Sequence, residues 1–424
     1  MVAAPLTTSA PVAAPAHPWV SALLGALPAP AGLRPETTLA ARAALAAAGL
    51  PSRRQEDWRF TDTAPIAAVA PQLLAPEALP ELPPVAEGHH RVVLDGRPET
   101  LAAVAWPAGI ELLSAEETQG ALGRCLDPEG KAPDWPVLLQ AACDAPVLAL
   151  RVRGAVNEVL ELVSEAGSGP GVLPVRVLLL LEPEARLELL QVHRSSGANL
   201  TSMLLEAELG AGAELRHGVV ANGEAESVLL ARLAIRQQPG SRFALATVSR
   251  GWGLVRLEPR VVQSEGSAET RLRALQVVDE HQIADTHSRV RFEGPEGRLE
   301  QLHKVVADGQ GRSVFNGAVV VPRLAQRTDA AQLSRSLLLS DRARVDTKPE
   351  LEIVADDVRC AHGATVSSLQ EDELFYLRSR GIGADAAARL LLRGYCQEIL
   401  GDFPAGAALW QAPSFSAGPE ETSR

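Results

Sequence analysis

A short sequence phrase recurs at a fixed interval in the middle of the chain. A turn ending in a small residue precedes a polar residue and an alternating strand in EPEARLELLQV, GAGAELRHGVV, QPGSRFALATV, GSAETRLRALQV and GPEGRLEQLHKV. The residues that open these strands lie 28 apart: Arg186, Glu214, Arg242, Thr270 and Arg298. Self-similarity at roughly 20 to 50 residues is typical of stacked repeats. Each repeat can supply two strands and two turns, so the interval predicts one coil of a β-solenoid per repeat, with the next equivalent residue at Gln326.

An antiparallel β-sandwich with coincidental spacing is the alternative, because short alternating strands occur there too. The composition favours the solenoid. Aromatic residues make up only 4% of the chain and there are two methionines, whereas Leu, Val and Ala are abundant. Such side chains suit many thin, similar layers better than one bulky core.

Helical patterns flank the β region. Residues 1–16 are rich in Ala, Pro and Thr and are expected to form a flexible tail. Residues 17–84 are expected to hold an N-terminal helical region, with helices in 19–28 and 36–50, and a proline-rich linker. Residues 85–366 are expected to be mainly β. Residues 367–424 are expected to contain a serine-capped helix ending near Gly381, a second helix interrupted or relayed at Gly394, and a loose tail of about twenty residues.

Charge and composition exclude several classes of function. The 424 residues carry a net charge of −12 without a block of Lys or Arg, which disfavours nucleic acid as a partner. The longest strongly apolar run, VLLLL, is far shorter than the roughly 20 residues of a membrane helix, so no membrane span is expected. Four scattered cysteines without CxxC argue against a zinc knuckle or a disulfide framework and favour a cytoplasmic location.

Cys360 and His362 form the most suggestive pair of side chains. On a strand, residues i and i+2 face the same side, so sulfur and imidazole would project together. These groups are ligands for soft metals and iron–sulfur clusters, but two ligands do not hold a cluster, and a second chain would have to supply the rest. A buried structural cysteine and histidine is the plainer alternative. A Cys–His nucleophile is disfavoured because parallel side chains do not converge.

The evidence for other candidate sites is weaker. Asp285 and His287 repeat the two-residue spacing and His303 follows, but surface or core histidines are the favoured explanation. The GSGPG sequence at 167–171 precedes a strand instead of a helix, and no Gly-Lys-Ser/Thr occurs. The chain is therefore not expected to bind a nucleotide itself.

The sequence from Ala331 to Ile382, which contains AQLSRSLLLS, CAHGATV and EDELFYLRSRG, strongly resembles the C-terminal region of the SufB/SufD family, scaffold subunits of the SUF iron–sulfur cluster assembly system. RRQEDWRFTD, VFNGAVVV and QRTDAAQ resemble its N-terminal and central motifs. The CAHGATV form, and Ser334 where SufB proteins carry a cysteine, favour the SufD branch.

The resemblance implies a mainly β fold, a right-handed parallel β-helix flanked by helical regions. It implies a scaffold without catalytic activity of its own that pairs with a SufB-like paralogue through the β-helix and binds a SufC-like ABC ATPase through its C-terminal helices. It also implies that His362, with Cys360 in a less certain role, contributes to a nascent iron–sulfur cluster shared with SufB. A homodimer of the isolated chain is a further option.

Two other functions remain open at this stage. One is a stand-alone β-helix enzyme acting on carbohydrate, which usually needs an acidic cleft with aromatic platforms. The other is a purely structural scaffold. Phe292 and Ser334 depart from the family pattern and argue against including His287 in a site. The type of cluster and the binding of a flavin are not indicated by the sequence.

Overall fold

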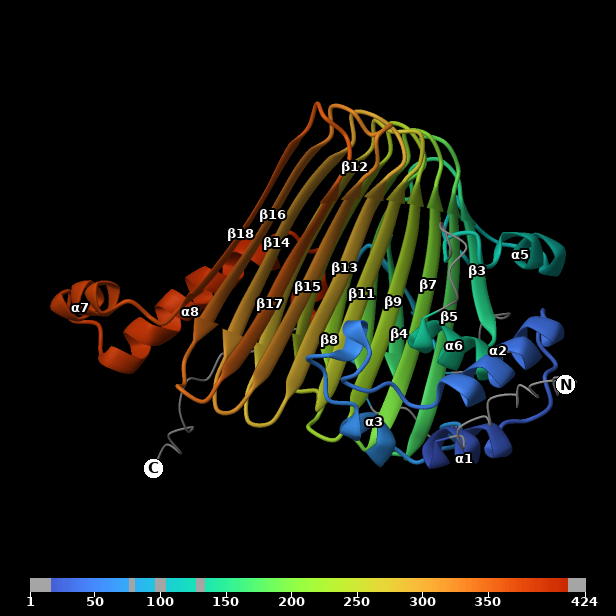
Figure 1. Cartoon of the computed structure of the whole chain (residues 1–424), viewed down its shortest axis with the longest axis horizontal. Coiled ribbons are helices and arrows are strands. Elements are labelled where there is room, and N and C mark those ends of the chain that lie inside the picture. The colour runs from blue at the N-terminus through green and yellow to red at the C-terminus, as the bar shows by residue number, and fades with distance from the viewer. Residues whose placement is uncertain (1–16, 76–80, 96–103, 127–133, 411–424) are drawn as a thin grey trace, which may run out of the picture.

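The computed structural model describes residues 17–75, 81–95, 104–126 and 134–410. They form a parallel β-solenoid of about eight turns with helices at both ends of the chain (Figure 1). The expected flexible tail at 1–16 lies outside the described residues. Across the described part of the chain, none of the helices is both long and apolar enough to cross a membrane.

From β3 onward, consecutive strands alternate between two nine-stranded sheets, so each coil gives one strand to each sheet. Sheet 1 contains, in spatial order, β1 (His89–Val93), β4 (Val159–Glu165), β6 (Arg186–Arg194), β8 (Glu214–Asn222), β10 (Arg242–Arg250), β12 (Glu269–Val278), β14 (Arg298–Ala307), β16 (Asp329–Leu338) and β18 (Arg359–Ser367). Sheet 2 contains β17 (Arg344–Ile353), β15 (Arg312–Val321), β13 (Ile283–Phe292), β11 (Leu254–Gln263), β9 (Val228–Gln237), β7 (Asn199–Leu209), β5 (Gly171–Leu181), β3 (Val147–Val152) and β2 (Ile110–Leu112). All these pairings are parallel except that of β2 with β3.

The predicted interval holds for the first coils and then drifts. Arg186 pairs with Glu214, and Glu214 with Arg242. The next partner of Arg242 is Glu269, so Thr270 lies one position beyond the expected register. The prediction of Gln326 is wrong, because the equivalent of Arg298 is Asp329 and Gln326 lies in the preceding turn. The coil from Arg242 to Glu269 is one residue shorter than the interval, and the next two coils are longer, without disturbing the pairing of the strands.

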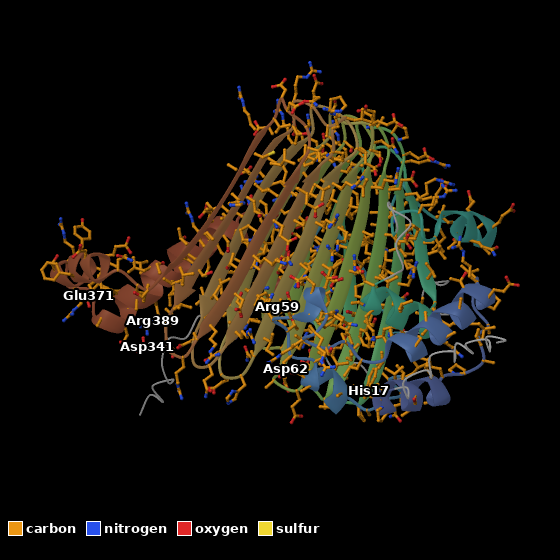
Figure 2. All side chains as sticks on the ribbon, in the orientation of Figure 1. His17, Arg59, Asp62, Asp341, Glu371 and Arg389 are labelled. Carbon is orange, nitrogen blue, oxygen red and sulfur yellow. The ribbon has the colours of Figure 1, made fainter. Side chains whose placement is uncertain are left out.

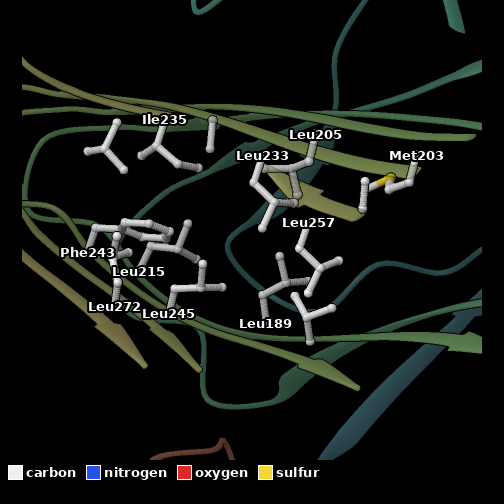
Figure 3. Packing of buried hydrophobic residues seen from close by; sticks show 14 of the residues in the cluster. Leu189, Met203, Leu205, Leu215, Leu233, Ile235, Phe243, Leu245, Leu257 and Leu272 are labelled. Atoms are coloured by element: carbon white, nitrogen blue, oxygen red, sulfur yellow. The ribbon is translucent and has the colours of Figure 1, made fainter. Parts of the chain in front are cut away.

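The interior between the sheets consists of stacked aliphatic layers, as the composition predicts. Leu187, Leu215 and Phe243 occupy one register on successive coils, and each is at most 2% exposed. Figure 3 shows part of this core, in which leucines from neighbouring strands pack together. Each coil therefore buries its apolar face only against the coils before and after it and the opposite sheet.

The N-terminal region covers the outer face of sheet 2 with α1 (Pro18–Ala26), α2 (Pro35–Ala48), a short 3₁₀ helix, η1 (Glu56–Trp58), and α3 (Ala64–Ala68). It is held by a buried ionic group. Arg256 Nη1 lies 2.5 Å from Asp285 Oδ2, and the Arg256 guanidinium carbon lies 4.1 Å from the centre of the Trp58 ring. Thr61 donates a hydrogen bond to the same carboxylate. The RRQEDWRFTD motif thus serves to dock this region onto the solenoid.

Two short helices were not expected in the β region: α5 (Ala115–Ala121) and α6 (Trp135–Ala142). The first begins with a capping box, in which Ser114 and Glu117 satisfy each other's main-chain donors. The second has Asp134 at its N-cap and proline in its first turn. Both signals are visible in the sequence. The expected linker is also partly docked, since Leu74 N donates to Val172 O on β5 at 2.8 Å.

The C-terminal region contains α7 (Glu371–Ser379) and α8 (Ala384–Leu400). Helix α8 continues through Gly394, so the expected interruption is wrong. It packs on the outer face of sheet 1, where Lys304 Nζ donates to Tyr395 O at 2.8 Å. The expected loose tail is wrong for residues up to 410, because a 3₁₀ helix, η2 (Ala407–Leu409), follows α8 and Trp410 is 4% exposed beneath Arg91. Residues 411–424 lie outside the described part.

Buried histidines should make the solenoid sensitive to acid. Burial lowers the pKa of His193 to about 4 and the pKa values of His217 and His303 to about 3. The unfolded chain binds these protons near pH 6.5, so the contribution to stability is complete above that pH and falls as the pH drops toward 4. Each histidine should add about 1.4 kcal/mol per pH unit to this slope.

The test is urea unfolding between pH 7 and pH 4.5. His303→Phe should reduce the slope of unfolding free energy against pH by about 1.4 kcal/mol per unit. Phe315→Leu, which alters the ring stacked on His303 at 4.3 Å, should lower stability by the same amount at every pH. An unchanged slope in His303→Phe would contradict the assignment.

Candidate functional site

The solenoid ends at two strands that pair on one side only. In sheet 1, β18 pairs with β16, and in sheet 2, β17 pairs with β15, with no further strand beyond either among the described residues. Both lie at the same end of the stack (Figure 1). Every residue of β18 except Cys360 and Gly363 is exposed. We call this end, formed by β17 and β18, the open end.

Cys360 and His362 lie on β18, as the alternating sequence predicted. Cys360 pairs with Ala330 and packs against the aliphatic core, so this face of the strand is directed to the interior side of the sheet. His362 lies two residues further along the same face and is exposed. A side chain at Gly363 would instead meet Leu333 on the outer face at 3.2 Å. The structure therefore places thiol and imidazole together at the end of the interior.

The thiol of Cys360 is protonated at neutral pH. Its partial burial and the nearby charge of Asp329 raise its pKa above the ordinary value, and a main-chain hydrogen bond from Ala330 opposes them only in part. No disulfide involves it. A thiolate at this position would have to be stabilised by a bound metal ion or by a cationic group of another chain.

The surroundings of His362 leave both of its ring nitrogens available. Within the described residues, no hydrogen bond or ion pair occupies its side chain. Its partner across the strand pair is Gln332, whose Nε2 donates to Gln301 Oε1 at 2.9 Å and whose Oε1 is buried without a partner. In the described ranges, no group of three or more His, Cys, Asp or Glu side chains could hold a metal ion. The described residues thus offer part of a ligand set.

The structure does not bring the other candidate histidines to the open end. His287 Nε2 lies 3.0 Å from Asp285 Oδ1 on the outer face of sheet 2, in the ionic group beneath Trp58. His303 is fully buried between the sheets and stacks on Phe315. Both have structural surroundings, which agrees with leaving His287 out of the site.

Helix α7 presents unburied apolar side chains. None of its residues is buried, and Phe375 and Tyr376 are 72% and 57% exposed. Figure 2 shows Glu371, on α7, beyond the end of the sheets. The expected serine cap is wrong, because Gln370 is the N-cap and makes no side-chain cap bond. Three acidic residues in the first turn favour the helix start instead.

An apolar rim at the open end was not identified from the sequence. Ile353 and Val354, at the end of β17 and just after it, are 39% and 62% exposed, and Val366 on β18 is 57% exposed. Equivalent aliphatic positions on inner coils are covered by the next coil. The signal was present in the sequence, since the alternation continues to Val366 and no further repeat follows it.

Comparison with known proteins identifies the family. The family model described as SUF system FeS cluster assembly, SufBD core domain, matches residues 163–395. A Synechocystis protein named as an iron–sulfur cluster assembly SufBD family protein is 30% identical over 383 residues, covering 84% of each chain. The iron–sulfur cluster assembly protein SufD of Escherichia coli is 26% identical over 381 residues, covering 83% of this chain and 85% of its own.

A plant relative extends the comparison. The chloroplastic protein ABCI7 of Arabidopsis thaliana is 37% identical over 239 residues, covering 55% of this chain and 50% of its own. The matched core domain covers the solenoid from β4 to β18 and reaches into α8, and the matches to the two bacterial relatives extend over most of the chain. The chain therefore belongs to the SufB/SufD family of the SUF iron–sulfur cluster assembly system, and it is SufD-like.

Proposed function

We propose that this chain is the SufD-like scaffold subunit of a complex in which an iron–sulfur cluster is assembled at the open end. The observation that carries the proposal is the exposed imidazole of His362 on β18, a strand with a free edge, beside Cys360 on the same face. A stand-alone carbohydrate-active enzyme is set aside because the family acts in cluster assembly.

The open end is suited to pairing with a SufB-like solenoid. A free edge strand presents unpaired N–H and C=O groups that a strand from another chain can satisfy. The exposed aliphatic residues Ile353, Val354 and Val366 would be buried by the same contact. A second copy of this chain offers the same edge, so we propose that the isolated chain forms a homodimer there.

The nascent cluster is the cargo of this interface. Neutral imidazole is a suitable ligand for iron, and thiolates from the SufB-like partner would complete the ligand set. Cys360 would join only after losing its proton, which its raised pKa disfavours until iron or a cationic group is present. Burial of the site between two solenoids would also limit the access of water and oxygen to the cargo.

The projecting helices provide the contact for a SufC-like ABC ATPase. Phe375 and Tyr376 on α7 are exposed and Leu390 on α8 is 50% exposed, a pattern of unburied apolar residues that marks protein-binding surfaces. Since α8 is also fixed to sheet 1 through Lys304 and Tyr395, movement of the ATPase would reach the solenoid wall. In this proposal the partner hydrolyses ATP, and this chain binds no nucleotide and is not itself an enzyme.

We propose that the complex works in the cytoplasm. All four cysteines are free, and Cys125, Cys143 and Cys396 are buried in apolar surroundings. Free thiols are compatible with a reducing compartment, and none of the four cysteines forms a disulfide that would need an oxidising one.

The role of His362 is tested by anaerobic reconstitution of the complex with SufB-like and SufC-like partners. His362→Ala should lower cluster yield at least tenfold, measured by absorbance and bound iron, while size-exclusion chromatography shows an intact complex. The matched control is His281→Ala, which changes another exposed histidine on a turn. Normal yield from His362→Ala would disprove the role.

The docking role of α7 is tested by binding of the isolated ATPase. Phe375→Asp with Tyr376→Ser should weaken binding by at least tenfold, because the change removes two exposed apolar contacts and adds a charge. The comparable substitution Leu39→Asp, at a residue 55% exposed on α2, should leave binding unchanged. Affinities are measured by calorimetry. Equal affinities for the unaltered chain and both variants would mean that the ATPase binds elsewhere.

The state of Cys360 is tested by alkylation with iodoacetamide at pH 7.5. Cys360 should be the labelled cysteine of the native chain, at a rate below that of a free thiol, because the other three are buried and their pKa values are also raised. Asp329→Asn should increase the rate of labelling, by less than about tenfold. Asp341→Asn, the control, should leave the rate unchanged. Mass spectrometry showing another cysteine modified first would contradict this assignment.

A further inference from the structure

A cavity of about 320 Å³ lies between α2, α6 and the turn after α5. It is at the N-terminal end of the molecule, away from β18. Its walls are mainly aliphatic and include Ala40, Ala41, Ala44, Leu122, Val137 and Leu138. Successive small residues on α2 keep this space open where larger side chains would close it. The volume falls at the lower end of the range of small-molecule pockets, roughly 300–1,000 Å³.

Two guanidinium groups line the cavity. Arg176 is held by Gln140 Oε1 at 2.8 Å and by the carboxylate of Glu206, and its Nε is buried without a partner. Arg34 donates to the carbonyl of Gln119, and no carboxylate among the described residues pairs with it. The two groups are close enough for the charge of Arg34 to add to the effect of burial, and together they lower the pKa of Arg176.

The nearby carboxylates do not neutralise Arg34. Glu206 is occupied by Arg176 and by the main-chain N–H of Gly123 at 2.7 Å. Asp144, which also lines the cavity, accepts main-chain hydrogen bonds at Oδ2 from Ala31 and Gly32, both at 2.8 Å. The side-chain hydroxyl of Thr38 donates to its Oδ1 at 3.0 Å. Its oxygens are thus engaged by neutral donors. Among the described residues, the cavity therefore combines an apolar interior with a guanidinium, that of Arg34, which no carboxylate contacts.

We propose that this cavity binds a medium-chain carboxylate, an aliphatic chain with a single anionic group. The chain would lie along the alanines of α2, and the carboxylate would accept hydrogen bonds from Arg34, for which a planar guanidinium is well matched. A space of about 320 Å³ is small for a ligand pocket, so an aliphatic chain of medium length, such as that of decanoate, is the class that we propose.

The test is calorimetric titration of the full-length chain with decanoate, with decanol as the uncharged analogue. Decanoate should bind at micromolar concentration. Arg34→Gln should weaken decanoate at least tenfold and leave decanol unaffected. Ala44→Leu, which adds bulk at a residue that lines the cavity, should weaken both ligands.

The matched control is Arg53→Gln, because Arg53 is an exposed arginine paired with Asp62 at 3.3 Å, and it should bind decanoate like the unaltered chain. Thermal unfolding should confirm that all variants are folded. Absence of decanoate binding, or equal binding by the Arg34→Gln and unaltered chains, would overturn the proposal. Cluster yield does not enter this test, so its outcome is independent of the role of His362.

Discussion

The hydrogen bonding between parallel coils is the constraint on which this structure depends. Each strand satisfies its backbone groups with the coils on either side, so a solenoid is complete everywhere except at its ends. At the N-terminal end, the antiparallel β2 and the helices cover much of the stack. At the other end, no further strand among the described residues pairs with the outer edges of β17 and β18. An incomplete sheet with an aliphatic rim is unfavourable in water and favourable in a complex.

This constraint explains why the candidate site is where it is. On an inner coil, the position of His362 is occupied by Gln332, Gln301 or Leu272, all buried by their neighbours. Only on the last coil can a polar, metal-binding side chain on the interior face remain accessible. The same side chain on β14 or β16 would be enclosed, as His303 is. The position of the imidazole in the stack therefore matters as much as its chemistry.

Much of the fold could be predicted from the sequence because it follows from local repetition. The 28-residue interval located β6, β8, β10 and β14, and the change of period after Val366 located α7 and α8. The exact register could not be predicted at Thr270 and Gln326, because changes in turn length, of one residue before Glu269 and of three residues before Asp329, leave no alternation signal. Gly394 was misinterpreted because a glycine on an exposed helix face costs only about 1 kcal/mol.

The site was also predicted in part, because part of it follows from local spacing in the sequence. Spacing alone places Cys360 and His362 on one face of a strand, but it cannot show that the strand is last in its sheet. The ionic group of Arg256 and Asp285 was not predicted, because it joins the N-terminal motif to residues about 200 positions later in the sequence. The burial of this ionic group gives the RRQEDWRFTD motif a structural role, which the sequence alone showed only as a resemblance to a family motif.

The central claim is that β18 is completed by a strand of another chain. Hydrogen–deuterium exchange of the β18 amides, measured with and without the SufB-like partner, tests it most directly. At a protein concentration low enough to dissociate the proposed homodimer, β18 should exchange fast in the isolated chain. It should be strongly protected in the complex with the SufB-like partner, with no change at β1, on the opposite edge of sheet 1. Unchanged exchange at β18 in a complex shown to be intact would contradict it.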